Sequence, residues 1–358
     1  MSRLRFREVS LSPRATALTT LLALLAAIAA GALLLFITGV ELRPAAQIMF
    51  TGALGSFRGL ADTLTLAIPL LLAGLGVAIA FKAGFWNIGA EGQIFMGGFA
   101  VAWVALTLGD GLPSIIFVPL LIAAGFAAGA LWGLIPALLK IRWKVHEVIS
   151  TILLNHIAIL WVNFVVHGPL NDGFGMPFSP ILPRAAWLDR FLGTRLHEGV
   201  FIAVIAAIAI YILLKYTSLG FKLRLVGANP RAARNCGISP ATIIVIAMII
   251  GGGLAGIAGM SEITGVQRRL LDRFSPGFGF TAIGVAMLGK LHPAGVVVSA
   301  FFFGALMRGS RALQTGMGVP IAIADIFVAI VIIFLVGGVL LARYRPVWGK
   351  KEVNGKDV

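Results

Sequence analysis

Residues 215–240, KYTSLGFKLRLVGANPRAARNCGISP, separate two long apolar runs, 198–215 and 241–262. The segment contains no Asp or Glu, and its five basic residues are Lys215, Lys222, Arg224, Arg231 and Arg234. Connections between neighbouring helices are usually only about 2–8 residues long. A longer, basic connection that is interrupted by Gly and Pro therefore predicts a docking surface for another molecule.

The composition places the whole chain in a membrane. Hydrophobic residues make up 59% of the sequence and charged residues 12%, whereas a soluble domain carries about 25% charged residues. The mean hydropathy is +0.99. The net charge of +15 is dispersed in loops between apolar segments, so it does not indicate nucleic-acid binding. The single cysteine, Cys236, excludes an intrachain disulfide and a Cys-based zinc site.

Apolar windows of about 20 residues predict helices that cross the bilayer. They lie at 17–38, 60–81, 87–108, 113–139, 148–167, 198–215, 241–262, 278–291, 294–308 and 320–342. We therefore predict an all-α polytopic membrane protein with about ten transmembrane helices, some short or interrupted, in which the eighth and ninth are too short for simple spans. The first run follows four arginines but is longer than an ordinary signal-peptide core, which favours an uncleaved span.

The distribution of basic residues predicts the orientation. If the N-terminus is cytoplasmic, 19 of the 29 Lys and Arg residues lie on that side and 10 on the other. Basic loops stay in the cytoplasm, so both termini are predicted to be cytoplasmic. The predicted domains are the N-terminus 1–16, the transmembrane domain 17–342 and the tail 343–358. Within the transmembrane domain, 168–197 is the main external loop and 216–240 a cytoplasmic loop.

Three further segments have characteristic compositions. The external loop 168–197 contains four prolines and is predicted to be irregular. Segment 41–58 has Arg43 and Arg58 flanking an apolar patch, which is typical of an element lying in the membrane interface. The tail 343–358 is polar and is predicted to be frayed.

Two glycine motifs have the spacing of nucleotide-binding motifs but lack the residue or the strand that such motifs require. Residues 284–290 have the P-loop spacing, but Leu291 follows where a Ser or Thr would hold magnesium. Residues 251–256 have a dinucleotide-binding spacing, but no strand precedes them, so we interpret these glycines as helix-packing residues. The five histidines show no metal-ligand spacing, and no Ser/His/Asp grouping is supported. We predict no catalytic residue, no metal site and no cofactor in this chain.

Two interrupted segments, 81–93 and 275–284, place polar residues and glycines at membrane depth. Such interruptions in a transporter indicate a path near the midplane. The residues predicted to line the path are Asn87, Glu91, Gln93, Phe280 and Thr281. For Asn87 and Glu91, helix capping and packing is the alternative interpretation.

Acidic residues near the ends of spans allow two interpretations. One is a proton relay, and the other is capping or pairing with a nearby arginine. Their scattering, one to a helix, favours the second. The residues are Asp62, Glu147, Glu262 and Asp325.

The basic segment contains signals for one short helix. Asn229 followed by Pro230 favours a helix start, and Gly237 is a good terminator, so a helix is predicted over 230–236. Ala232 and Ala233 present little bulk and are predicted to seat in a groove of another protein. The predicted docking residues are Asn229, Pro230, Arg231, Ala232, Ala233 and Gly237.

Four segments, 81–93, 146–170, 218–238 and 277–306, resemble the permease subunits of bacterial ABC importers. The resemblance is strongest to the nucleoside-type branch of the branched-chain amino acid and simple sugar permeases. It implies the fold of an ABC importer transmembrane domain in the bacterial inner membrane, in contact with lipid. It also implies a second permease subunit, two ATPase subunits that bind ATP and Mg, and a solute-binding protein that delivers a small-molecule solute.

The resemblance assigns the docking segment to coupling with the ATPase. The family pattern there is often Glu-Ala-Ala, three residues and Gly. This chain has Arg231-Ala232-Ala233 followed by Gly237, so an arginine stands where the pattern has an acid and the acidic contact stays open. A heterodimer of two different permeases is the arrangement that the family commonly uses.

The leading functional hypothesis is the permease subunit of an ATP-driven importer for nucleosides or nucleobases, with ATP hydrolysis in separate subunits. The alternatives within this class are simple sugars and branched-chain amino acids. A self-sufficient secondary transporter would need buried, paired carboxylates. An integral-membrane enzyme would need a catalytic constellation that the sequence does not contain.

Overall fold

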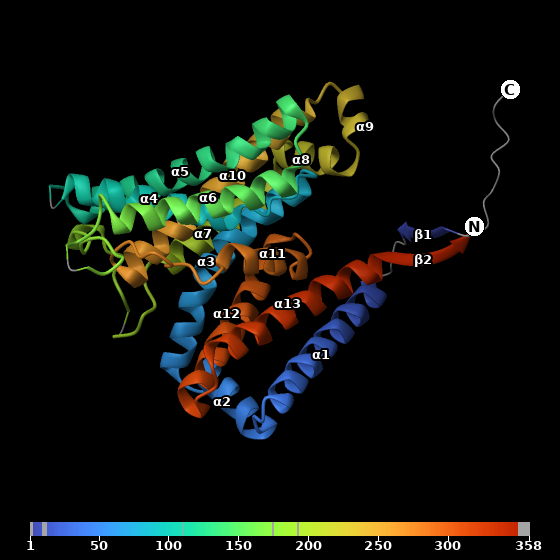
Figure 1. Cartoon of the computed structure of the whole chain (residues 1–358). Helices are drawn as coiled ribbons and strands as arrows, with labels where there is room; N and C mark the ends of the chain where they lie inside the picture. Colours follow the sequence, from blue (N-terminus) through green and yellow to red (C-terminus); the bar gives the residue numbers. More distant parts are fainter. Residues whose placement is uncertain (1–2, 9–12, 110, 174, 192, 350–358) are drawn as a thin grey trace.

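The computed structural model describes residues 3–8, 13–109, 111–173, 175–191 and 193–349, and most of these residues are helical (Figure 1). The helices are α1 Pro13–Ile37, α2 Leu42–Leu54, α3 Phe57–Lys82, α4 Ala90–Leu108, α5 Ser114–Trp143, α6 Glu147–His167, α7 Gly199–Tyr216, α8 Ser218–Ala228, α9 Pro230–Asn235, α10 Pro240–Ser261, α11 Phe278–Leu288, α12 Pro293–Met317 and α13 Ile321–Arg343. A 3-10 turn covers Arg184–Ala186, a π-helical turn covers Glu262–Gln267, and two strands, β1 Arg3–Glu8 and β2 Tyr344–Gly349, pair with each other.

Within the described residues, seven helices are long and apolar enough to cross a membrane. The predicted all-helical membrane fold is confirmed. The ninth predicted segment, 294–308, was expected to be short, but α12 has 25 residues. The helix continues through Arg308 and Arg311, which ended the apolar window. The eighth segment, α11, has 11 residues and at about 1.5 Å per residue is too short to cross the bilayer by itself.

Helix α10 lies at the centre of the bundle and packs against α3, α4 and α5. Its glycines allow the close approach. A Cβ atom at Gly256 would lie 2.0 Å from the carbonyl oxygen of Gly125 on α5, and one at Gly129 would lie 2.2 Å from the carbonyl oxygen of Gly252. The glycine motif 251–256 therefore packs helices together, as the sequence predicted.

The two ends of the chain lie together. Helices α1 and α13 pack side by side, and β1 pairs antiparallel with β2 beyond their ends (Figure 1). The prediction of a frayed tail is wrong for residues 344–349, because the α1–α13 contact brings a partner strand to them. Residues 350–358 of the predicted tail, and 1–2 and 9–12 of the predicted N-terminus, lie outside the described residues.

The two predicted loops lie at opposite ends of the bundle (Figure 1). Helices α8 and α9 form one end, and segment 168–197 with its 3-10 turn forms the other. That segment is held to the residues after the π-helical turn, where Ser179 N donates to Leu270 O (2.9 Å) and Leu270 N donates to Ser179 Oγ (3.0 Å). Segment 41–58, predicted as an interfacial element, contains helix α2, which packs against α12 and α3.

Candidate functional site

Helix α9 forms where the sequence predicted a short helix. The side-chain oxygen of Asn229 accepts hydrogen bonds from the backbone N–H groups of Arg231 (3.0 Å) and Ala232 (3.1 Å). Pro230 occupies the first helical position, and Gly237 takes a left-handed backbone with φ +74°. The helix ends at Asn235, one residue before the predicted end. These local signals are sufficient to define it.

The exposed face of α9 is not the one predicted. Ala233 is fully buried within the chain and Ala232 is half-buried, whereas Arg231, Arg234 and Asn235 are exposed. The prediction that both alanines are presented to a partner is therefore wrong for Ala233, because tertiary packing turns that side of the short helix inward. The surface available to another protein is basic.

The α8–α9 segment rests directly on α3. A Cβ atom at Gly227, in the last turn of α8, would lie 2.0 Å from the carbonyl oxygen of Lys82 at the end of α3. Gly84, just beyond α3, lies against Gly227 as well. The α8–α9 segment is therefore packed directly against the end of a 26-residue helix.

The polar residues at the start of α4 and just before it bond to one another and to α6. The side-chain amides of Asn87 and Gln93 bond to each other (3.2 and 3.3 Å), and both side chains are almost fully buried. Asn155 on α6 accepts from Gly92 N (2.8 Å) and donates to Ile88 O (2.8 Å). Asn155 was not among the predicted site residues, although an Asn inside an apolar helix is itself a signal of a polar contact.

Glu91 joins the two interrupted segments. Its carboxylate is 2% exposed and accepts from the backbone N–H of Gly279 (2.6 Å), 188 residues further along the chain. A Cβ atom at Gly279 would lie 2.2 Å from Glu91 N, so the starts of α4 and α11 are in direct contact. This geometry corresponds to the capping and packing interpretation. A path-lining role for Asn87, Glu91 and Gln93 stays a prediction.

Phe280 and Thr281 lie beside a cavity of about 460 Å³ between α11, α12 and α13. We call it the inner cavity. Phe280 is 42% exposed and Thr281 is buried at the cavity wall. Asp325 of α13 and Arg311 of α12 also line it. A path-lining role for Phe280 and Thr281 stays a prediction.

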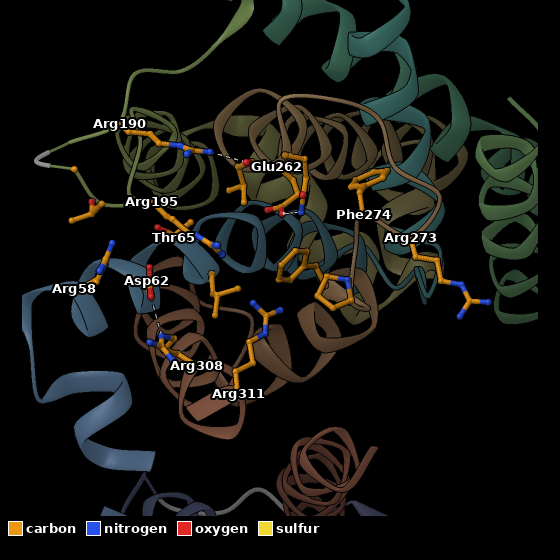
Figure 2. A pocket seen from close by; sticks show the side chains of 17 residues that line it. Arg58, Asp62, Thr65, Arg190, Arg195, Glu262, Arg273, Phe274, Arg308 and Arg311 are labelled. Atoms are coloured by element: carbon orange, nitrogen blue, oxygen red, sulfur yellow. Dashed lines mark hydrogen bonds and ion pairs between the residues drawn. The ribbon is translucent and has the colours of Figure 1, made fainter. Parts of the chain in front are cut away.

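A larger cavity of about 770 Å³ lies at the end of the bundle that carries segment 168–197. We call it the arginine cavity (Figure 2). Its lining includes two acidic residues, Asp62 and Glu262. Its arginines are Arg58, Arg190, Arg195, Arg273, Arg308 and Arg311. All six belong to the group that the charge distribution predicted to be external, but their convergence in one cavity was not predicted.

Two of these arginines are engaged by the protein. Arg308 Nε forms an ion pair with Asp62 Oδ2 at 3.1 Å. Arg190 donates from Nε to Gly265 O (3.0 Å) and from Nη2 to Val266 O (2.7 Å). Both carbonyls belong to the π-helical turn, whose wider winding interrupts the regular α-helical ladder. Arg190 therefore fixes the turn that carries Glu262.

The other arginines differ in exposure. Arg58, Arg195 and Arg273 are exposed, and Arg273 points away from the group in Figure 2. Arg311 is half-buried and lines both the arginine cavity and the inner cavity. It therefore stands at the boundary between the two.

His197 packs against the π-helical turn that forms part of the wall of the arginine cavity. It is 1% exposed, and its Nδ1 accepts from Gly199 N (3.1 Å). A Cβ atom at Gly265, in the π-helical turn, would lie 2.5 Å from the His197 ring. Burial, and then the charge of Arg190, lower the pKa of His197 to about 4, so the ring is neutral at pH 7.

The scattered acidic residues have separate environments. Asp62 pairs with Arg308, and Glu147 pairs with Lys140 at 2.6 Å. For Asp62 this is the predicted pairing with an arginine, whereas the partner of Glu147 is a lysine. Lys140, the partner of Glu147, also lies over the Phe85 ring.

A multi-pass helical fold with a large cavity at one end and an exposed basic helix at the other is typical of a transporter subunit. Residues 59–336 match the family described as the branched-chain amino acid transport system permease component. The chain belongs to this family. It is the membrane-spanning, non-enzymatic permease subunit of an ABC importer.

Individual relatives cover nearly all of the chain. The glucose ABC transporter permease protein TsgB13 of Haloferax volcanii is 37% identical, over 94% of this chain and 93% of its own. The guanosine ABC transporter permease protein NupP of Bacillus subtilis is 35% identical, over 95% and 98%. A second guanosine ABC transporter permease protein of Bacillus subtilis, NupQ, is 29% identical, over 68% and 78%.

Proposed function

We propose that this permease imports nucleosides or nucleobases across the bacterial inner membrane, with both of its termini in the cytoplasm. It works with a second, different permease, with ATPase subunits and with a solute-binding protein. The similarity to NupP over almost the whole of both chains supports the solute class. The similarity of the same chain to NupQ, a second permease in the same organism, supports pairing of two different permeases.

The observation that carries the proposed route is the position of Arg311. The solute leaves the binding protein, enters the arginine cavity, passes Arg311 and reaches the inner cavity beside Phe280 and Thr281. Both volumes lie within the range of about 300–1,000 Å³ that small-molecule sites occupy. The second permease closes the open side of this route.

The opposite end of the molecule couples transport to ATP hydrolysis. The exposed arginines of α9, Arg231 and Arg234, dock on the ATPase subunit. Force reaches the cavities through α3, which begins beside the arginine cavity at Arg58 and Asp62 and ends against Gly227.

A charge reversal tests this coupling role. Arg231→Glu with Arg234→Glu should abolish capture of the ATPase by the purified permease pair, because a basic contact becomes acidic. The matched control is Arg142→Glu, an exposed basic residue in the last turn of α5. Equal ATPase capture by the double variant and the wild type would remove the docking assignment.

Glucose is the second candidate solute, because TsgB13 is 37% identical. Direct binding of radiolabelled guanosine, glucose, ribose and leucine to the cognate solute-binding protein distinguishes the candidates. We expect guanosine to bind, and the reconstituted complex to import it only with ATP. A binding protein that holds glucose and no nucleoside would replace the proposal by the sugar alternative.

A further inference from the structure

Glu262 and Arg311 are the least exposed of the cavity-lining charges whose hydrogen-bonding capacity the described residues leave unfilled, since Arg58, Arg195 and Arg273 are exposed. Glu262 is 6% exposed, and Gln267 Nε2 donates to its Oε1 at 3.0 Å. Among the described residues, none donates a hydrogen bond to Oε2 of Glu262. In the same described ranges the Arg311 guanidinium makes no hydrogen bond or ion pair, in contrast to Arg308 and Arg190.

The two open groups reach the cavity from different elements. Glu262 lies in the π-helical turn after α10, and Arg311 lies on α12 (Figure 2). Arg311 is attracted electrostatically by Glu262 and Asp325, but no direct ion pair joins Glu262 and Arg311 in the part of the chain that the structure describes. Each therefore keeps hydrogen-bonding capacity for a molecule that enters between them.

Their chemistry is complementary to one kind of base. A carboxylate only accepts hydrogen bonds, and a guanidinium only donates them. A 6-oxopurine presents two acceptors, O6 and N7, on one edge, which match the guanidinium fork. On the adjoining edge, N1–H and, in guanine, the exocyclic amine are donors suited to the carboxylate. Adenine instead carries an amine donor at position 6, which would face the donors of Arg311.

We propose that Glu262 and Arg311 form a recognition site for the base of a 6-oxopurine nucleoside. Arg311 donates to O6 and N7, and Glu262 accepts from N1–H and the exocyclic amine. This inference rests on the proposed nucleoside function and adds the class of base. The π-helical turn, held by Arg190, places the acceptor, and α12 places the donor at the entrance to the inner cavity.

The buried acid favours a base over the acidic side chains of a partner protein as the occupant. A partner carboxylate would meet the exposed Arg58 and Arg195 at the rim, but further in it would be repelled by Glu262. A 6-oxopurine uses Glu262 instead of being repelled by it.

The test is ATP-dependent uptake by the full transporter in liposomes, with its second permease, ATPase and binding protein. Initial rates are measured for radiolabelled guanosine, inosine, adenosine and glucose. The variants are Glu262→Gln and Arg311→Gln, and the matched control is Arg184→Gln, which is exposed on segment 168–197 outside the cavity. Because the binding protein is unchanged, any change in selectivity arises in this permease.

We expect wild-type uptake of guanosine and inosine to exceed that of adenosine. Each cavity variant should lower guanosine uptake by about ten- to a hundredfold, the usual discrimination of a bidentate base contact, and leave adenosine uptake unchanged or raised. Glu262→Gln should affect inosine less than guanosine, because inosine lacks the exocyclic amine. Arg184→Gln should match the wild type.

Several outcomes would overturn the inference. These are equal losses for guanosine and adenosine, no loss for either, a wild type that carries both equally well, or loss of binding-protein capture by the variants. The last would assign the charges to docking of the partner. Uptake of glucose with no nucleoside would instead reject the proposed function, so the two failures are distinguishable.

Discussion

Two buried acids, Glu91 and Glu262, show how the same residue type serves opposite purposes in this molecule. Glu91 faces several donors from the protein, namely the Ser275 side chain and backbone N–H groups at the start of α11, with Gly279 N–H at 2.6 Å, and it closes the contact between α4 and α11. Glu262 receives one hydrogen bond from Gln267 and lines a cavity of about 770 Å³. A buried acid whose hydrogen bonds are made within the fold holds the structure together. One that is left open beside a cavity is suited to a solute.

The largest effect on folding is expected at the close contact between the starts of α4 and α11, beside Glu91. Gly279→Ala places a Cβ 2.2 Å from the backbone nitrogen of Glu91 and 2.5 Å from its Cα, so α4 and α11 must separate. We expect little or no folded protein in the membrane, measured by detergent extraction and size-exclusion chromatography. The control is Gly284→Ala on the same helix, whose Cβ would meet side chains of Ile332 and Phe303 at 3.3 and 3.4 Å. A normal yield of Gly279→Ala would show that the contact is not required.

Features that depend on residues close together in the sequence could be predicted, and features that depend on distant residues could not. Helix α9 depends on local signals, the Asn229 cap and the Gly237 terminator, so its position was predicted to within one residue. The burial of Ala233 depends on tertiary packing and was missed. The extent of α12 was missed because Arg308 ended the apolar window. The helix continues past this charge because Arg308 pairs with Asp62, which lies 246 residues away in the sequence and could not be identified as its partner.

The candidate site shows the same division. The charge distribution predicts all six arginines on one side of the membrane, but no local pattern indicates that four separate segments bring them to one cavity. Conversely, Asn87 and Gln93 were identified as unusual polar residues, and only the fold shows that they satisfy each other. Unusual residues can be found in a sequence, whereas the partners that they meet cannot.

The second prediction concerns acid sensitivity at the wall of the arginine cavity. The pKa of His197 is lowered to about 4 in the folded protein, against 6.5 for an ordinary histidine. The unfolded chain therefore binds the proton first, and folding stability is lost as the pH falls from about 6.5 to about 4. The loss approaches about 3 kcal/mol at the lower end, at 1.36 kcal/mol per unit.

Thermal unfolding of the detergent-solubilised protein between pH 7 and pH 4 measures this loss. His197→Asn removes the titration and keeps an acceptor for Gly199 N–H, so its melting temperature should fall less steeply with acid than that of the wild type. His156→Asn, an exposed histidine, is the control. Parallel curves for the wild type and His197→Asn would contradict the buried, neutral state of His197.

The smallest effect in stability tests the comparison of the two acids directly. Glu91→Gln keeps the shape but puts an amide donor among backbone donors at the start of α11, which should lower the free energy of unfolding by about 1–3 kcal/mol. In Glu262→Gln the new side chain faces the cavity and Gln267, whose amide can rotate so that its oxygen accepts a hydrogen bond. The free energy of unfolding of this variant should therefore be close to that of the wild type.

Uptake should show the reverse order, with guanosine import reduced strongly in Glu262→Gln and only in proportion to folded protein in Glu91→Gln. Measuring melting temperature and uptake on the same preparations separates the two roles. If both variants lose stability equally and transport per folded molecule is unchanged in both, Glu262 is a structural acid like Glu91 and the distinction between closed and open acids does not hold.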